Sequence, residues 1–205
     1  MTLVFFGYGS LVWKPPPHTV GKKQGYVKGF IRRFAQSSND HRGVPDRPGR
    51  VVTLVSAQDW EGITGERTSE EDAKVWGVGW EIDGSMESKV KADLDHREKN
   101  GYTVEQVAIY DLVDGVETVI VPDATIYVGK VDNEAFVGSE PLDFLAKRIL
   151  SCQGPSGPNR EYLYRLAGAV RGLVGDCQDA YLFELEETVR RLEKGETAQG
   201  AGSDR

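Results

Sequence analysis

The stretch Leu3–Leu11, which reads LVFFGYGSL, predicts a first β-strand that runs directly into a glycine-rich turn. The apolar run Leu3–Phe6 lacks the basic leading region and cleavage site of a signal peptide. Gly7 and Gly9 interrupt it too early for a membrane span, which needs roughly 20 apolar residues. Because two glycines flanking a turn let backbone N–H groups approach a ligand, the loop is a candidate anion-binding nest, although a plain tight turn fits these residues equally well.

The first two-thirds of the chain carry further strand patterns. Most are β-branched or alternating apolar runs bounded by turn residues. The range 24–37 reads as one long strand or two bent ones, and Val113–Gly115 reads as a hairpin turn. The expected strands after the first are Gln24–Ser37, Val51–Val55, Val75–Ile82, Tyr102–Leu112 and Val116–Val128.

Helical patterns occupy one segment of the first half and most of the last third. In Ser85–Glu98, apolar residues recur every four positions, at Met86, Val90 and Leu94. Three further helices are expected around Leu142–Ile149, Tyr162–Leu173 and Leu182–Leu192.

Strands followed by helices indicate one α+β domain over residues 1–194, with residues 195–205 as a disordered tail. The charged, Gly- and Thr-rich segment Gln58–Lys74 reads as a surface excursion. Many short strands with glycine kinks suit a small closed or nearly closed barrel, but periodicity alone does not separate a barrel from an open sheet.

Composition narrows the classes of partner and compartment. The 205-residue chain has a formal net charge of −7, which argues against nucleic acid because phosphate backbones require a basic face. Its two cysteines, Cys152 and Cys177, are too few for a disulfide scaffold and lack zinc-type spacing, so a cytoplasmic protein is the default expectation. An acidic protein of this kind binds an acidic small molecule only through a local pocket of donors.

A dense polar loop, Ser37–Arg50, joins two expected strands. It holds three arginines, including Arg42 and Arg50, whose guanidinium groups are suited to clamping carboxylates. Composition alone favours an ordinary solvated loop over such a clamp. The histidine in it, His41, has no partner spacing that would make a metal site.

Glu98 follows Leu94 by four residues and continues the apolar stripe of its helix. A carboxylate on such a stripe points toward the interior, where desolvation raises its pKa toward the range that a general acid and base needs. An exposed helix end is the alternative for the run of four ionisable residues around it. Farther on, Asn159 reads as a helix N-cap and Tyr162 as a core aromatic.

Taken together, these segments resemble the ChaC-type γ-glutamylcyclotransferases, the glutathione-specific branch of that enzyme group. The similarity runs in order over most of the chain. The segments that carry it are 6–15 (FGYGSLVWKP), 32–34 (RRF), 40–43 (DHRG), 48–54 (PGRVVTL), 75–78 (VWGV), 97–102 (REKNGY), 127–129 (YVG) and 154–157 (GPSG).

The resemblance implies a small mixed β-barrel flanked by helices and a reaction that needs no cofactor. The implied substrate is glutathione, cleaved to 5-oxoproline and Cys-Gly, with Glu98 as the catalytic general base and then acid. The implied substrate-binding residues are Gly7, Tyr8, Gly9, Ser10, Leu11 and Val12, with Arg42, Arg50 and Tyr162 beside them.

Two other functions remain open from the sequence. The first is a cyclotransferase of broader range that acts on γ-glutamyl amino acids or amines. The second is a binding module without catalytic activity. Glu98 argues against it, because such a module has no need of a half-buried carboxylate. The expected partner is the small-molecule substrate, and neither nucleic acid nor membrane is expected. The sequence is silent on a protein-interaction role alongside catalysis and does not determine the oligomeric state.

Overall fold

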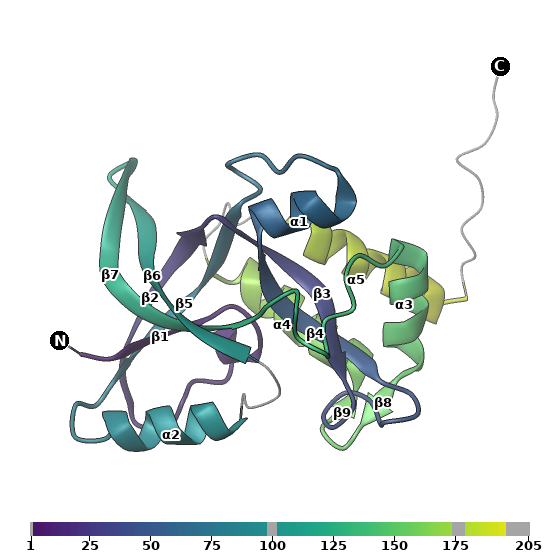
Figure 1. The fold of residues 1–205 in the computed structure, drawn as a ribbon, viewed down its shortest axis with the longest axis horizontal. Coiled ribbons are helices and arrows are strands. Elements are labelled where there is room, and N and C mark those ends of the chain that lie inside the picture. Colours follow the sequence, from purple (N-terminus) through teal and green to yellow (C-terminus); the bar gives the residue numbers. More distant parts are fainter. Residues whose placement is uncertain (1, 98–101, 174–178, 196–205) are drawn as a thin grey trace.

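The structure is a computed structural model that describes residues 2–97, 102–173 and 179–195 (Figure 1). Glu98 and most of the expected tail therefore lie outside the described residues. The structure consists of a β-barrel on one side, a group of three helices on the other, and a second small sheet between them (Figure 1).

Five strands form the closed barrel. The barrel is mixed because β1 runs parallel to β7, with Phe5 opposite Thr125, whereas the other neighbours are antiparallel. The expected fold class, an α+β domain with a small mixed barrel flanked by helices, is confirmed. In barrel order the strands are β1 (Val4–Gly7), β5 (Lys74–Ile82), β2 (Thr19–Lys28), β6 (Tyr102–Val113) and β7 (Val116–Gly129).

The barrel is tight enough that glycine is needed inside it. A Cβ atom on Gly77 would collide with the carbonyl oxygen of Gly7 on β1. The β6–β7 hairpin turns at Asp114 and Gly115, both with positive φ, as the sequence predicted for this turn.

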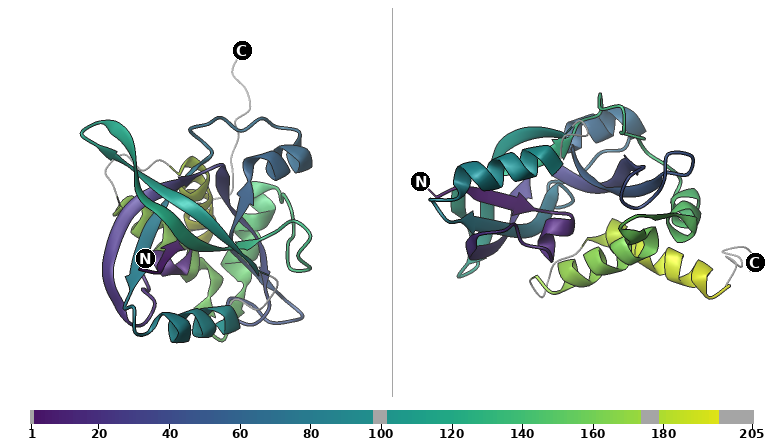
Figure 2. Two further views of the ribbon diagram at one scale, coloured as in Figure 1. Left: turned by 60° about the vertical axis from the view of Figure 1, so that its left-hand side comes forward. Right: turned by 90° about the horizontal axis from the view of Figure 1, so that it is seen from below.

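The predicted strand 24–37 divides into β2 and β3 (Phe30–Ser38) at Gly29, whose φ is +82°. β3 pairs only with β4 (Gly49–Ser56) among the described strands, which makes a separate two-stranded sheet. Helices α3 (Leu142–Ser151), α4 (Asn159–Arg171) and α5 (Ala180–Glu193) share a core with one face of this sheet (Figure 2). A two-residue hairpin, β8 (Gln153–Gly154) and β9 (Gly157–Pro158), precedes α4.

Helix α2 (Glu87–Arg97) covers one side of the barrel (Figure 1). Val90 and Leu94 are buried against Phe5, Ile82 and Tyr127, so the predicted apolar stripe is the face that packs. The side chain of the next residue on that stripe, Glu98, belongs to the undescribed part of the chain.

The segment 58–74 is not only a surface excursion, because it begins with helix α1 (Ala57–Thr64). The Ser56 hydroxyl accepts a hydrogen bond from the Asp59 N–H (3.0 Å), and the left-handed Gly65 ends the helix. Trp60 is the buried residue of α1 and packs on the outer face of the β3–β4 sheet. The cap residues at both ends, Ser56 and Gly65, were the sequence signal for this helix. It was missed because its eight residues are mostly polar and give no apolar periodicity.

No helix in the described ranges is both long and apolar enough to cross a lipid bilayer.

Candidate active site

A cavity of about 540 Å³ lies where the barrel meets the β3–β4 sheet and helix α4. Its wall combines the end of β1 and the loop after it, the end of β3 and the polar loop after it, the first half of β4, one residue each from β6, β7 and the β8–β9 turn, and the first half of α4. This volume is within the range of small-molecule sites in proteins, about 300–1,000 Å³.

The glycine loop, residues Gly7–Val12, forms one side of this region. It folds back on itself so closely that a Cβ atom on Gly7 would lie 2.6 Å from the Leu11 Cβ. A short 3-10 turn, η1 (Ser10–Val12), follows, in which the Val12 N–H donates to the Gly9 carbonyl at 3.0 Å. Only glycine at position 7 permits this close return of the chain.

Side chains from the barrel and the small sheet hold the glycine loop at both ends. Arg32 Nε donates to the Tyr8 carbonyl oxygen at 3.0 Å, and Trp80 Nε1 donates to the Leu11 carbonyl oxygen at 2.7 Å. Arg32 is buried and is also bonded to Asp179 and to the Trp76 carbonyl. The loop backbone is therefore fixed before any ligand arrives, as a preorganised binding site requires.

Tyr162, on α4, belongs to both the core and the site. Its ring makes edge contacts with Trp13 and Phe34, at centroid distances of 5.7 and 5.9 Å. Its hydroxyl oxygen lies 3.2 Å from where a Cβ atom of Gly9 would be. The predicted core aromatic thus also presents its hydroxyl to the glycine loop at the cavity.

The structure brings together most of the predicted site residues. Those that line the cavity are Tyr8, Gly9, Ser10, Leu11, Arg42 and Tyr162. Gly7 and Val12 are in the same loop but are not part of the cavity wall, and Val12 is buried in the main core.

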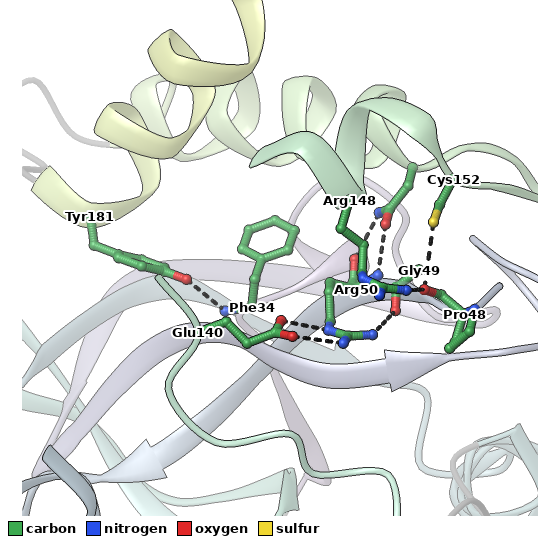
Figure 3. Close-up of polar contacts among 9 residues, drawn as sticks. Phe34, Pro48, Gly49, Arg50, Glu140, Arg148, Cys152 and Tyr181 are labelled. Atoms are coloured by element: carbon green, nitrogen blue, oxygen red, sulfur yellow. Dashed lines mark hydrogen bonds and ion pairs between the residues drawn. The ribbon is translucent and has the colours of Figure 1, made fainter. Parts of the chain in front are cut away.

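Arg50 is not part of the cavity wall. Figure 3 shows that it is bonded instead to Glu140 and Gly49. Its guanidinium group forms a two-point ion pair with Glu140: Nε lies 2.7 Å from Oε2 and Nη2 lies 2.8 Å from Oε1. Nη1 also donates to the Gly49 carbonyl oxygen. These contacts satisfy the buried cation locally, so the structure gives it a structural role.

Asn159 is not the N-cap of α4, as the sequence suggested, because Pro158 occupies that position. The buried Asn159 side chain instead bridges to β4: Oδ1 accepts from the Arg50 N–H and Nδ2 donates to the Arg50 carbonyl oxygen, both at 2.7 Å. It thereby joins the start of α4 to the edge of the small sheet.

The polar loop 37–50 is ordered by contacts with the β8–β9 hairpin rather than simply solvated. The His41 carbonyl oxygen accepts from the Ser156 N–H at 2.9 Å. A Cβ atom on Gly154 would collide with that same oxygen, so glycine is needed there. This packing holds Arg42 half-buried over the Tyr162 ring, with 5.6 Å between the guanidinium carbon and the ring centroid.

Gln36 is a cavity residue that sequence reasoning missed. Its side chain is buried, 2 % exposed, and its Oε1 atom has no hydrogen-bond partner among the described residues. A buried polar atom without a partner is costly, and it marks a place where a ligand can supply the missing hydrogen. The signal in the sequence was one amide at the end of the apolar strand run Phe30–Ala35.

The cavity wall also contains Lys14 and Arg165, which the sequence analysis did not single out. Within the described part of the chain, no group of three or more His, Cys, Asp and Glu side chains is placed to hold a metal ion. Glu98 lies outside the described residues, so its position relative to the cavity stays a prediction.

Comparison with known proteins agrees with this architecture. The family model described as "ChaC-like protein" matches residues 3–192. Curated relatives include "Glutathione-specific gamma-glutamylcyclotransferase" of Schizosaccharomyces pombe, 37 % identical over 93 % of both chains, and "Glutathione-specific gamma-glutamylcyclotransferase 1" of Danio rerio, 37 % identical over 90 % of this chain and 87 % of the relative.

A solved structure shows the same fold. It is the yeast γ-glutamyl cyclotransferase described as specific to glutathione, with a TM-score of 0.82 and 32 % identity; the alignment covers 98 % of this chain and 99 % of that one. The family match over nearly the whole chain, the barrel and the glycine loop at a cavity lead to one conclusion: this chain belongs to the ChaC-like protein family.

Proposed function

We propose that this chain is a glutathione-specific γ-glutamylcyclotransferase, which converts glutathione to 5-oxoproline and Cys-Gly. The observation that carries the proposal is the rigid glycine loop at the wall of a cavity of ligand size, in a chain whose relatives from Schizosaccharomyces pombe and Danio rerio bear that enzyme name. The similarity to these relatives covers at least 90 % of the chain.

The reaction is an internal displacement. The α-amine nitrogen of the glutamyl group attacks its own γ-carbonyl carbon, a five-membered lactam closes, and the bond from that carbon to the cysteine nitrogen breaks. The attacking group is already tethered to its target, so holding the folded-back conformer supplies much of the rate enhancement.

A single carboxylate can carry the proton through this reaction. It first takes a proton from the α-ammonium group and then gives it to the departing cysteine amine. We assign this role to Glu98. The sequence supports the assignment: Glu98 precedes Tyr102 by four residues, and Tyr102 lines the cavity.

Two groups of the described chain are suited to hold the glutamyl end of the substrate. We infer that backbone N–H groups of the fixed glycine loop, whose Gly9 and Leu11 line the cavity, donate to the α-carboxylate or to the oxyanion of the tetrahedral intermediate. The unpartnered Gln36 Oε1 is an acceptor for the α-ammonium group. Tyr162, with its hydroxyl beside Gly9, closes this end of the cavity.

The test is to incubate the purified protein with reduced glutathione and detect 5-oxoproline and Cys-Gly by mass spectrometry. We expect equal amounts of both products. Glu98→Gln is expected to fold normally, bind glutathione and lose about 10²–10⁴-fold in kcat. The exposed Glu70→Gln is the matched control and should keep its turnover.

Failure to release 5-oxoproline would contradict the proposed reaction. Wild-type turnover in Glu98→Gln would contradict the residue assignment while leaving the reaction in place.

A further inference from the structure

One part of the cavity wall is cationic although the protein as a whole is acidic. Lys14, Arg42 and Arg165 line the cavity, and Asp40 is the one carboxylate among the described residues that line it. The three cations are called the basic rim below. They come from distant parts of the chain: the segment just after the glycine loop, the polar loop and helix α4.

The basic rim lacks counter-ions within the described ranges of the chain, where no carboxylate forms an ion pair with any of its three members. The member of the rim on α4, Arg165, differs in this respect from the two arginines on either side of it. Arg160 pairs with Glu193 at 3.1 Å and Arg171 pairs with Glu186, whereas Arg165, between them, has no such partner among the residues that the structure describes.

Arg42 is the member of the rim with the strongest need for an anion. It is half-buried, and one nitrogen donates to the Pro158 carbonyl oxygen at 3.2 Å. Burial lowers the pKa of Arg42, and the positive charge of Arg165 adds to this effect, while Tyr162 and Glu161 oppose it. Two mutually repelling guanidinium groups at a cavity wall are stabilised when an anion lies between them.

Tyr162 connects the basic rim to the glycine loop. Its hydroxyl is beside Gly9, and its ring is 5.6 Å from the Arg42 guanidinium carbon. Arg165 is three residues after Tyr162, which places both on the same side of α4. In extended glutathione, the glycine carboxylate lies two residues beyond the γ-amide, about 7 Å away. Because Tyr162 lies beside both Gly9 and Arg42, we expect the glycine carboxylate to fall at the basic rim when the γ-amide lies at the loop.

We propose that Lys14, Arg42 and Arg165 form a subsite for the C-terminal glycine carboxylate, and that this subsite makes the enzyme prefer the tripeptide over shorter γ-glutamyl compounds. The inference rests on the proposed function and deepens it. A γ-glutamyl amino acid carries its carboxylate one residue, about 3.5 Å, closer to the loop and does not reach all three cations.

The experiment compares three substrates: glutathione, its glycine amide, and γ-Glu-Cys. The amide has the same size as glutathione but no terminal negative charge. We measure kcat/KM for each with the wild type, Arg42→Gln and Arg165→Gln, and use Arg160→Gln, on the same helix but outside the cavity, as the matched control.

We expect the ratio of kcat/KM for glutathione to that for the amide to fall about tenfold or more in each rim variant, because a charge-assisted hydrogen bond is lost only with the acid. The control should leave the ratio unaltered. Circular dichroism checks that each variant is folded, and the exposed Arg165 is the substitution least able to disturb the core.

An equal loss for glutathione and its amide in both rim variants would overturn the subsite. If no γ-glutamyl substrate releases 5-oxoproline, the proposed function fails. In that case the affinities of glutathione and its amide, measured by calorimetry, still test the subsite. If the rim binds the glycine carboxylate, the amide binds more weakly.

Discussion

Two buried polar side chains lie on the neighbouring strands β4 and β3, Arg50 and Gln36, and they differ in whether their polar atoms have partners. Ser37 is the partner of Arg50 and Gln36 the partner of Val51, so the Arg50 and Gln36 side chains leave the sheet on opposite faces. The Arg50 guanidinium group is paired with Glu140 and the Arg50 backbone with Asn159, whereas Gln36 Oε1 has no hydrogen-bond partner among the described residues.

We expect this difference to separate the polar groups that build the fold from those that bind a ligand. Arg50, Glu140 and Asn159 are called the paired cluster. The unpaired wall consists of Gln36, whose Oε1 has no hydrogen-bond partner, and of Arg42 and Arg165, which have no ion-pair partner among the described residues, although Arg42 donates to the Pro158 carbonyl oxygen. Removing a member of the paired cluster should cost stability, because its partners lose their hydrogen bonds. Removing a member of the unpaired wall should cost function and little or no stability.

The largest effect on stability is expected for Glu140→Ala. The substitution leaves Arg50, whose side chain is 7 % exposed, without its carboxylate. Breaking a buried ion pair on one side costs about 3–5 kcal/mol, and the partial exposure of Glu140 favours the lower end. Urea unfolding measures the change.

The matched control for that experiment is the double variant Arg50→Met with Glu140→Leu, which removes both charges and should recover most of the lost stability. A loss of below about 1 kcal/mol in Glu140→Ala, the size of an exposed pair, would place Arg50 outside the paired cluster.

A somewhat smaller loss is expected for Asn159→Ala, about 2 kcal/mol. Asn159 is fully buried, and its removal leaves the Arg50 N–H and carbonyl oxygen, which it bonds at 2.7 Å, without partners. Thermal unfolding measures the effect, and the exposed Glu187→Ala on α5 is the control, which should unfold like the wild type. An unchanged melting temperature in Asn159→Ala would show that water replaces both bonds.

The fold was largely predictable because each strand and helix carries its own local pattern. The β6–β7 hairpin follows from an Asp-Gly turn between apolar runs, and the packing face of α2 follows from the spacing of Val90 and Leu94. The helix α1 was missed because Trp60 is its single buried residue, which gives no periodic pattern. Closure of the barrel depends on contacts between distant strands, such as Phe5 with Thr125, which no local pattern encodes.

The candidate site was predictable only in part. The glycine loop was identified because glycine in a turn has a local reason, here the close approach of Leu11 to Gly7. Arg42 and Arg50 looked alike in sequence, and what distinguishes them is a partner 90 residues away, Glu140. Gln36 was missed because an amide in a strand is ordinary until the surrounding atoms show that its oxygen has no donor.

The unpaired wall is tested by Gln36→Met, which keeps the volume and removes the amide. We expect stability to rise by about 1 kcal/mol, since a buried unpartnered oxygen is replaced by an apolar group. In the same variant, KM for glutathione should rise about tenfold, because the acceptor for the α-ammonium group is gone. Denaturant unfolding and steady-state kinetics measure the two effects, and a fall in stability would assign Gln36 to the fold.

The smallest effect concerns Tyr181, another paired group, whose hydroxyl oxygen accepts from the Phe34 N–H at 3.2 Å (Figure 3). Burial raises the pKa of Tyr181 to about 12. Its unfolded value is about 10, so between these values the folded state binds more protons and stability falls as the pH rises. Tyr181→Phe should flatten this alkaline decline; an unaltered slope in pH-dependent unfolding would contradict the assignment.

The contacts of Arg32 link parts of the chain that are synthesised far apart in time. One guanidinium group holds the Tyr8 carbonyl of the glycine loop and, at the same time, Asp179 at the start of α5. During translation the loop leaves the ribosome well before Asp179, the counter-charge that fixes its anchor, which is made only with α5. A nascent or truncated chain that ends before residue 179 therefore carries the loop without its finished support, and the part of the site made first is the part completed last.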